Sequence, residues 1–160
     1  MSEFKFPTEV IDLPSKGLIY LESSPLSSGT IELKYMSAKE EDILTNVNFI
    51  EKGIIVDKLL QSLIVSKINY SELITGDKNA ILVAARILGF GAEYPIEVLD
   101  KYGKKIPVTI NLSELKNKPF NESLFVKEKN EFIYVLPQSK VTVVFKLLTH
   151  GDEQKIEEEI

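Results

Sequence analysis

The sequence predicts a mixed α+β fold in which a central helical unit is flanked by β-structure. In the central stretch, about residues 37–90, apolar residues recur at helical spacing and capping signals precede them. On both sides of it, apolar and polar residues alternate as they do in β-strands. With 160 residues, the chain fits one domain. We expect this domain at 1–150, made of an N-terminal β arm (4–36), the helical unit (37–91) and an antiparallel β region (92–148), before a short C-terminal helix begins at 151–160.

The N-terminal arm is expected to form a hairpin that covers a sheet edge. Pro7 and Pro14 lack a backbone N–H group, which restricts any strand here to an edge position. The segment LPSKGL at 13–18 is typical of a turn, because Pro14 fixes φ and Gly17 accepts a positive φ. The alternative is an arm that docks on a partner. That alternative makes Leu13, Pro14 and Gly17 candidate partner-binding residues.

Two segments complete the arm. ESSPLSSG at 22–29 consists of polar and turn-forming residues, and it predicts a flexible loop. TIELKYM at 30–36 alternates well enough to predict a strand that leads into the helical unit.

The helical unit is predicted from its caps and its periodicity. Ser37 and Glu40 match the capping box, in which each side chain accepts the backbone proton of the other residue. Residues 55–64 have helical spacing, with apolar residues on one side. Asp77 is a suitable N-cap for a helix at 78–88, whose nearly continuous apolar composition predicts burial on all sides.

The ionisable residues of this unit have two interpretations each. Glu40, Glu41 and Asp77 could serve a small hydrolase, but such a site needs a buried acid with a perturbed pKa, which the pattern does not indicate. Helix capping is the favoured interpretation. Arg86 lies in an apolar helix, so we expect it to pair with a carboxylate or, alternatively, to contact a partner. His150, the single histidine, predicts neither a metal site nor a catalytic site.

The last third of the chain alternates at a period of two. Residues 93–100 and 105–112 predict a hairpin whose turn contains Gly103. Two further strands are predicted at 132–136 and 141–147.

A short helix is predicted from Asp152, with Ile156 and Ile160 on one face. So short a helix is marginal in water. We therefore expect it to be unpaired in the isolated chain, and either the natural chain continues past Ile160 or the segment binds a partner. Ile156 and Ile160 are therefore candidate partner-binding residues.

Composition argues against several classes of function. Without cysteine, the chain has no disulfide, no thiolate zinc site and no cysteine nucleophile. A net charge of −5 does not favour duplex binding, so a nucleic-acid-binding or regulatory adaptor remains a weaker alternative. The sequence contains no apolar run of membrane-spanning length and no signal-peptide pattern, so we expect the cytoplasm as its place of synthesis. We predict no catalytic residue, no metal and no cofactor.

Three phrases, taken in order, resemble one protein family. They are LPSKGLIY at 13–20, KYMSAKEEDILTN at 34–46 and GDKNAILVAARILGFG at 76–91. Together they are similar to the baseplate hub subunits and hub assembly proteins of T-even-like, contractile-tailed bacteriophages, over roughly residues 10–150. Some members carry a cysteine pair at the hairpin turn, whereas this chain reads LDKYGK at 99–104.

The resemblance implies a non-enzymatic protein of phage tail morphogenesis. Its partners would be other baseplate hub or tail proteins, which it would bind as a structural hub component or as an assembly chaperone. It would act in the host-cell cytoplasm during assembly, and a structural component would also be found in the virion. The resemblance leaves the oligomeric state open.

Overall fold

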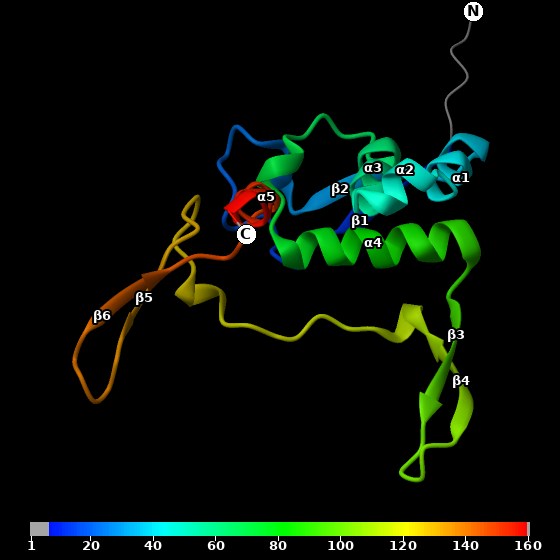
Figure 1. Ribbon diagram of the computed structural model, residues 1–160. Helices are drawn as coiled ribbons and strands as arrows, with labels where there is room; N and C mark the ends of the chain where they lie inside the picture. Colours follow the sequence, from blue (N-terminus) through cyan, green and yellow to red (C-terminus); the bar gives the residue numbers. More distant parts are fainter. Residues whose placement is uncertain (1–6, 160) are drawn as a thin grey trace, which may run out of the picture.

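The computed structural model describes residues 7–159 and confirms the mixed α+β class (Figure 1). Three separate two-stranded antiparallel sheets are present in this part of the chain, together with α-helices between the first and second sheets and at the C-terminal end. The elements are β1 (Thr8–Asp12), β2 (Thr30–Lys34), α1 (Ala38–Leu44), α2 (Val47–Glu51), α3 (Ile55–Leu63), α4 (Thr75–Phe90), β3 (Glu93–Leu99), β4 (Lys105–Asn111), β5 (Phe132–Val135), β6 (Thr142–Phe145) and α5 (His150–Glu159).

The expected N-terminal hairpin is present, but its connection is longer than the turn that the sequence suggests. β1 pairs with β2 from Thr8↔Lys34 to Asp12↔Thr30, and residues 13–29 join the two strands. The predicted turn at 13–18 therefore forms only the first part of this connection. The predicted start of the arm at residue 4 lies outside the described residues.

The polar loop predicted at 22–29 is present, but it contains a short 3-10 helix. Residues Pro25–Ser28 form a 3-10 turn whose Leu26 is completely buried. This turn packs closely against Gly17, which has φ +76°, and a Cβ atom at Gly17 would lie 2.3 Å from the carbonyl oxygen of Ser27. The single apolar residue among polar ones thus orders the segment, because its burial repays the lost chain entropy.

Helices α1 and α3 form as predicted, and the short helix α2 lies between them in the chain. The capping box at Ser37 and Glu40 begins α1, and Gly53, with φ +67°, follows the last turn of α2. α3 buries Leu59, Leu60 and Leu63 on one side.

Helix α4 differs from the prediction in its start and in its burial. It begins at Thr75, so Asp77 is its third residue and not its N-cap. Among its apolar residues only Ile81 and Ala85 are buried. The side that carries Val83 faces the connector at 112–117 across an open groove, so the expected burial on all sides is wrong.

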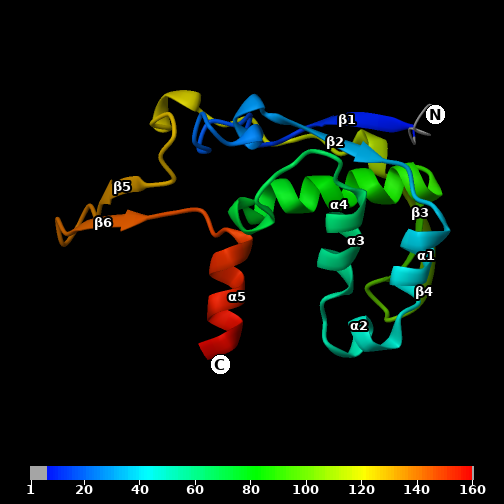
Figure 2. The ribbon, with the colours of Figure 1, turned by 90° about the horizontal axis from the view of Figure 1, so that it is seen from above.

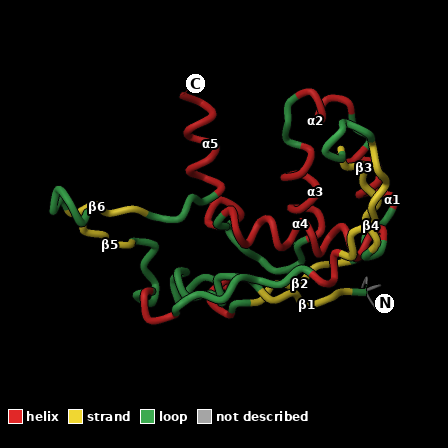
Figure 3. The backbone as a smooth tube through the Cα atoms, turned by 90° about the horizontal axis from the view of Figure 1, so that it is seen from below, coloured by secondary structure: helices red, strands yellow, loops and turns green. Residues whose placement is uncertain are grey.

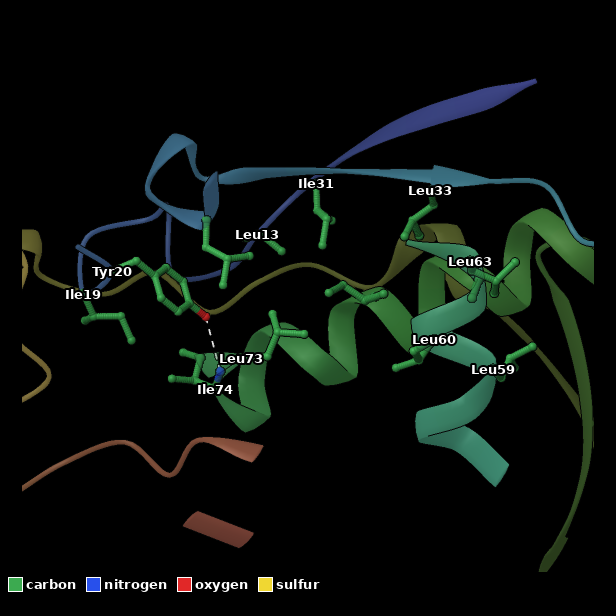
Figure 4. Close-up of a cluster of buried hydrophobic side chains, with 13 residues drawn as sticks. Leu13, Ile19, Tyr20, Ile31, Leu33, Leu59, Leu60, Leu63, Leu73 and Ile74 are labelled. Atoms are coloured by element: carbon green, nitrogen blue, oxygen red, sulfur yellow. Dashed lines mark hydrogen bonds between the residues drawn. The ribbon is translucent and has the colours of Figure 1, made fainter. Parts of the chain in front are cut away.

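Among the described residues, the fully buried apolar side chains lie between Leu13 and Ala85. Figure 4 shows these side chains converging from the β1–β2 hairpin, α3, the segment just before α4, and α4 itself. Within the described residues, neither β3–β4, β5–β6 nor α5 contributes an apolar side chain to this fully buried set. We call the segment from β1 to α4 the body.

Both later hairpins project from the body (Figure 1). β3 and β4 extend from the C-terminal end of α4, and the connector then runs back along α4 to β5 and β6 at the opposite end. In the views turned by 90° from Figure 1, α5 also projects away from α4 (Figures 2 and 3).

Replacing Leu60 with alanine should strongly destabilise the body. Leu60 is fully buried on α3, and truncating such a leucine leaves a cavity that costs about 2–5 kcal/mol of unfolding free energy. Urea denaturation measures the effect, with exposed Lys58→Ala on the same helix as the control. Equal denaturation midpoints for the two variants would show that the buried face of α3 is assigned incorrectly.

Candidate functional site: buried acids and exposed hairpins

The carboxylate of Asp77 joins the start of α4 to the first loop of the chain. Its Oδ1 accepts the backbone N–H of Ser15 at 2.9 Å, and its Oδ2 accepts the hydroxyls of Ser15 and Tyr20 at 2.6 Å each. The Tyr20 oxygen in turn accepts the backbone N–H of Ile74 at 3.2 Å (Figure 4). Burial, followed by the adjacent Asp77 charge, raises the pKa of Tyr20 above its usual range. We call Ser15, Tyr20 and Asp77 the Asp77 anchor.

A second buried carboxylate, Glu40, joins α1 to β2 and α3. It accepts hydrogen bonds from Lys34 Nζ at 2.8 Å, from the Ser37 hydroxyl at 2.6 Å and from the Ser62 hydroxyl at 2.6 Å. Burial acts to raise the pKa of Glu40, but the hydrogen bonds from Lys34, Ser37 and Ser62 outweigh it and lower the pKa to about 2. Glu40 therefore carries a charge at neutral pH although its side chain is inaccessible to solvent.

The two acids do not form a catalytic pair. Each accepts hydrogen bonds from its own donors, which belong to separate parts of the body, and Glu41 lies exposed beside Glu40 on the surface of α1. Glu40 accepts four hydrogen bonds and Asp77 accepts three, all from groups of the body, so these contacts occupy most of the acceptor positions of both carboxylates. Asp77 instead holds the first loop against α4, and Glu40 holds α1 against β2 and α3.

The first turn of α5 is attached to the body, which the sequence did not predict. The His150 N–H donates to the carbonyl of Leu73 at 2.7 Å, and the Thr75 N–H donates to the carbonyl of Leu148 at 3.0 Å. The helix begins at His150 and not at Asp152. The expectation that the segment from Asp152 is unpaired is wrong for its first turn, since Glu153 accepts the hydroxyl of Thr75 on α4 at 2.7 Å and Asp152 accepts from Lys146 Nζ at 2.7 Å.

Polar side chains complete this attachment. The His150 ring is buried, with its centroid 4.8 Å from that of Tyr70, and its Nδ1 lies 3.2 Å from Lys78 Nζ. Glu153 accepts the Thr75 hydroxyl at 2.7 Å, and this bond, together with the Lys78 charge, lowers the pKa of Glu153. In the described chain, no three histidine and acidic residues are placed to hold a metal ion.

Arg86 connects the end of α4 to the start of β3. Its guanidinium donates to the carbonyl oxygens of Gly91 at 2.9 Å and Glu93 at 3.4 Å. It also lies 5.0 Å from the ring centroid of Phe90 and 5.5 Å from that of Tyr94. The expected carboxylate pairing is thus replaced by carbonyl groups at the helix end, where a positive charge is favourable.

The β3–β4 hairpin carries an apolar face that is only partly covered in the described chain. The register pairs Tyr94 with Ile110, Ile96 with Val108 and Val98 with Ile106, which places all six on one face. All of them except Ile96 remain 37–43% exposed. The sequence predicted this face correctly, but it contained no signal that the face would lie outside the core.

The β5–β6 hairpin exposes apolar residues on both faces. Tyr134 and Phe145 lie on one face and are 52% and 53% exposed, while Ile133 and Val144 lie on the other at 74% and 61%. A series of phenylalanine rings joins the hairpin to the connector at centroid distances of 5.1–5.5 Å, in the order Phe120, Phe125, Phe132 and Phe145. Phe125 also packs against the core of the body.

The predicted partner-binding residues occupy different environments. Leu13 and Gly17 are buried in the body, and Pro14 is half-buried beside them. Ile156 is 47% exposed on α5, and Ile160 lies outside the described residues. The structure does not bring these residues together on one surface.

Comparison with known proteins decides the family. A family model described as T4 bacteriophage base plate protein matches residues 9–159. The chain belongs to this family. It is a structural protein of the phage baseplate, and membership implies other tail proteins as neighbours. Searches of curated proteins and of solved structures gave no match. No helix in the described part of this baseplate protein is long and apolar enough to cross a membrane.

Glu40→Gln should reduce stability most at neutral pH and least in acid. The pKa of Glu40 is lower in the folded protein than in the unfolded chain, so its ionised form stabilises the fold above about pH 5. That contribution is lost as the pH falls towards 2. Urea denaturation from pH 7 to pH 2.5 should show the gap between wild type and Glu40→Gln narrowing. The gap for the exposed neighbour Glu41→Gln should stay small throughout, and a pH-independent gap for Glu40→Gln would contradict the assignment.

Proposed function

We propose that this baseplate protein is a non-enzymatic hub component or hub assembly chaperone that binds other hub or tail proteins through its projecting hairpins. The observation that carries the proposal is the separation of the core from the exposed apolar surface. The fully buried apolar set is complete between Leu13 and Ala85, while both later hairpins expose apolar faces. Contiguous exposed apolar surface of this kind marks protein interaction sites.

The energetics of an isolated hairpin support the same proposal. A two-stranded sheet is marginally stable in water by itself. The β3–β4 face stays partly exposed in the described chain, although its six apolar side chains alternate as they do in a covered sheet. A partner that covers this face would stabilise the hairpin and gain the free energy of apolar burial.

The proposal places the protein in the host-cell cytoplasm during assembly. A hub component would also be present in the finished virion, whereas a chaperone would be found only in the infected cell. Mass spectrometry of purified virions compared with infected-cell lysate separates the two roles.

A charge on the apolar face of β4 should weaken binding to a tail partner. Val108→Lys places an ammonium group on this face. Thr109→Lys, at the next residue, places the same group on the opposite face of the hairpin. Burying an unpaired charge is costly, so we expect about a tenfold or greater loss of affinity for Val108→Lys only. Calorimetry with purified hub and tail proteins of the same phage measures it.

Two outcomes would count against the proposal. Binding of none of these proteins by the wild-type chain would contradict the partner role itself. Equal affinities for the two lysine variants would show that the β3–β4 face is not the contact. Unfolding curves of both variants serve to verify that the body remains folded.

A further inference from the structure

The β5–β6 hairpin leaves both of its backbone edges unpaired. Leu136 N–H donates to the carbonyl of Val141 at 2.9 Å, so the pair 136/141 is a hydrogen-bonded one. Because bonded and non-bonded pairs alternate in an antiparallel ladder, the pairs 134/143 and 132/145 are also bonded. The backbone groups of Ile133, Val135, Thr142 and Val144 therefore point outward, and no third strand meets them in the described chain.

In the β3–β4 hairpin, proline residues block the pairing of a further strand at the outward-pointing backbone positions. Its bonds from Leu112 N–H to Ala92 and from Asp100 N–H to Lys104, both 2.9 Å, belong to the even-numbered pairs. Pro95 and Pro107 are odd-numbered and so occupy outward positions on β3 and β4, where they remove a donor. Proline on an edge strand is a common device against further pairing. Residues 132–136 and 141–145 contain no such proline.

The root of β5–β6 is fixed in register by a side chain. The Asn130 amide donates to the Leu147 carbonyl at 2.8 Å and accepts the Leu147 N–H at 2.9 Å. Residues 130 and 147 are opposite each other in the β5–β6 register, so the amide takes the place of a backbone pair. The side chain of Asn130 thus extends the β5–β6 ladder by one pair, and no third strand borders the hairpin in the described chain.

The composition of the hairpin identifies the kind of partner. Strands that are apolar on both faces are typical of sheets covered on both sides. A lipid surface would accept the apolar side chains, but it would leave the outward N–H and C=O groups without partners at a cost of several kcal/mol each. A second copy would pair one edge and leave its own other edge open, which favours unlimited growth.

We propose that β5–β6 binds an extended segment of another tail protein by adding it as a strand to an open edge. Backbone pairing supplies the contact, and the apolar side chains of the partner strand would alternate onto the two faces. This inference rests on the proposed function and specifies its partner as a β-strand. It assigns a separate role to each hairpin: β3–β4 docks through its face and β5–β6 through its edge.

Hydrogen exchange tests the pairing directly. The probes are purified hub and tail proteins of the same phage, added one at a time to the full chain. In the free chain the amides of Ile133, Val135, Thr142 and Val144 should exchange rapidly. In the complex the two on one strand, either β5 or β6, should become protected by at least about tenfold, because every second amide of an added edge forms a new backbone bond.

Matched variants separate the contribution of the backbone N–H to binding from that of the side chain. Ile133→Pro and Val144→Pro each remove one outward N–H, while Ile133→Ala and Val144→Ala keep it. On the edge that is used, proline should weaken binding about tenfold more than alanine does. The protected Tyr134 amide reports whether the hairpin persists in each variant.

Every other result overturns the inference. If a partner binds while the four outward amides still exchange rapidly, the strand addition fails but the proposed function stands. If no tail protein binds, both fail. Protection that grows with the concentration of the chain alone would identify a second copy as the occupant, and protection by neutral phosphatidylcholine vesicles would identify lipid.

Discussion

The Asp77 carboxylate is the constraint on which the body depends. It is fully buried, and its three hydrogen bonds come from a loop that is about sixty residues away in sequence. A buried charge without donors would cost several kcal/mol, so the loop at 13–20 and the first turn of α4 are stable only together. The position of α4 then fixes where both hairpins begin. β3 follows the C-terminal end of α4. At the start of α4, Leu73 and Thr75 form backbone hydrogen bonds with His150 and Leu148, which follow β6 in the chain.

The phrases that resemble the baseplate proteins coincide with these buried acids. LPSKGLIY provides Ser15 and Tyr20, and GDKNAILVAARILGFG provides Asp77. KYMSAKEEDILTN provides the Lys34, Ser37 and Glu40 side chains that meet Ser62 on α3. The three phrases therefore contain the residues that hold the body together, and none of them includes a residue of β3–β4 or β5–β6. Under the proposed function, the body supports the two hairpins and the hairpins bind the partners.

The sequence predicted the local structure well because its signals were local. Alternation placed both later hairpins, and the capping box placed α1 at Ser37. Prediction from the sequence failed where groups far apart in the chain determine the role of a residue. Asp77 looked like an N-cap because its partners, Ser15 and Tyr20, lie far away in sequence, and Arg86 suggested an ion pair although carbonyl groups at the helix end satisfy it. Alternation also shows which residues share a face of β3–β4, but it does not show whether anything covers that face.

A double-mutant cycle on Tyr20→Phe and Asp77→Ala tests the central role of the buried carboxylate most directly. Residues that share one hydrogen-bonded network are coupled, so the two changes together should cost about 0.5–3 kcal/mol less than the sum of the single changes. Unfolding free energies from urea denaturation at pH 7 give the four corners of the cycle. Strictly additive costs would contradict the account, because they would mean that the Tyr20 hydroxyl and the Asp77 carboxylate contribute to the fold independently.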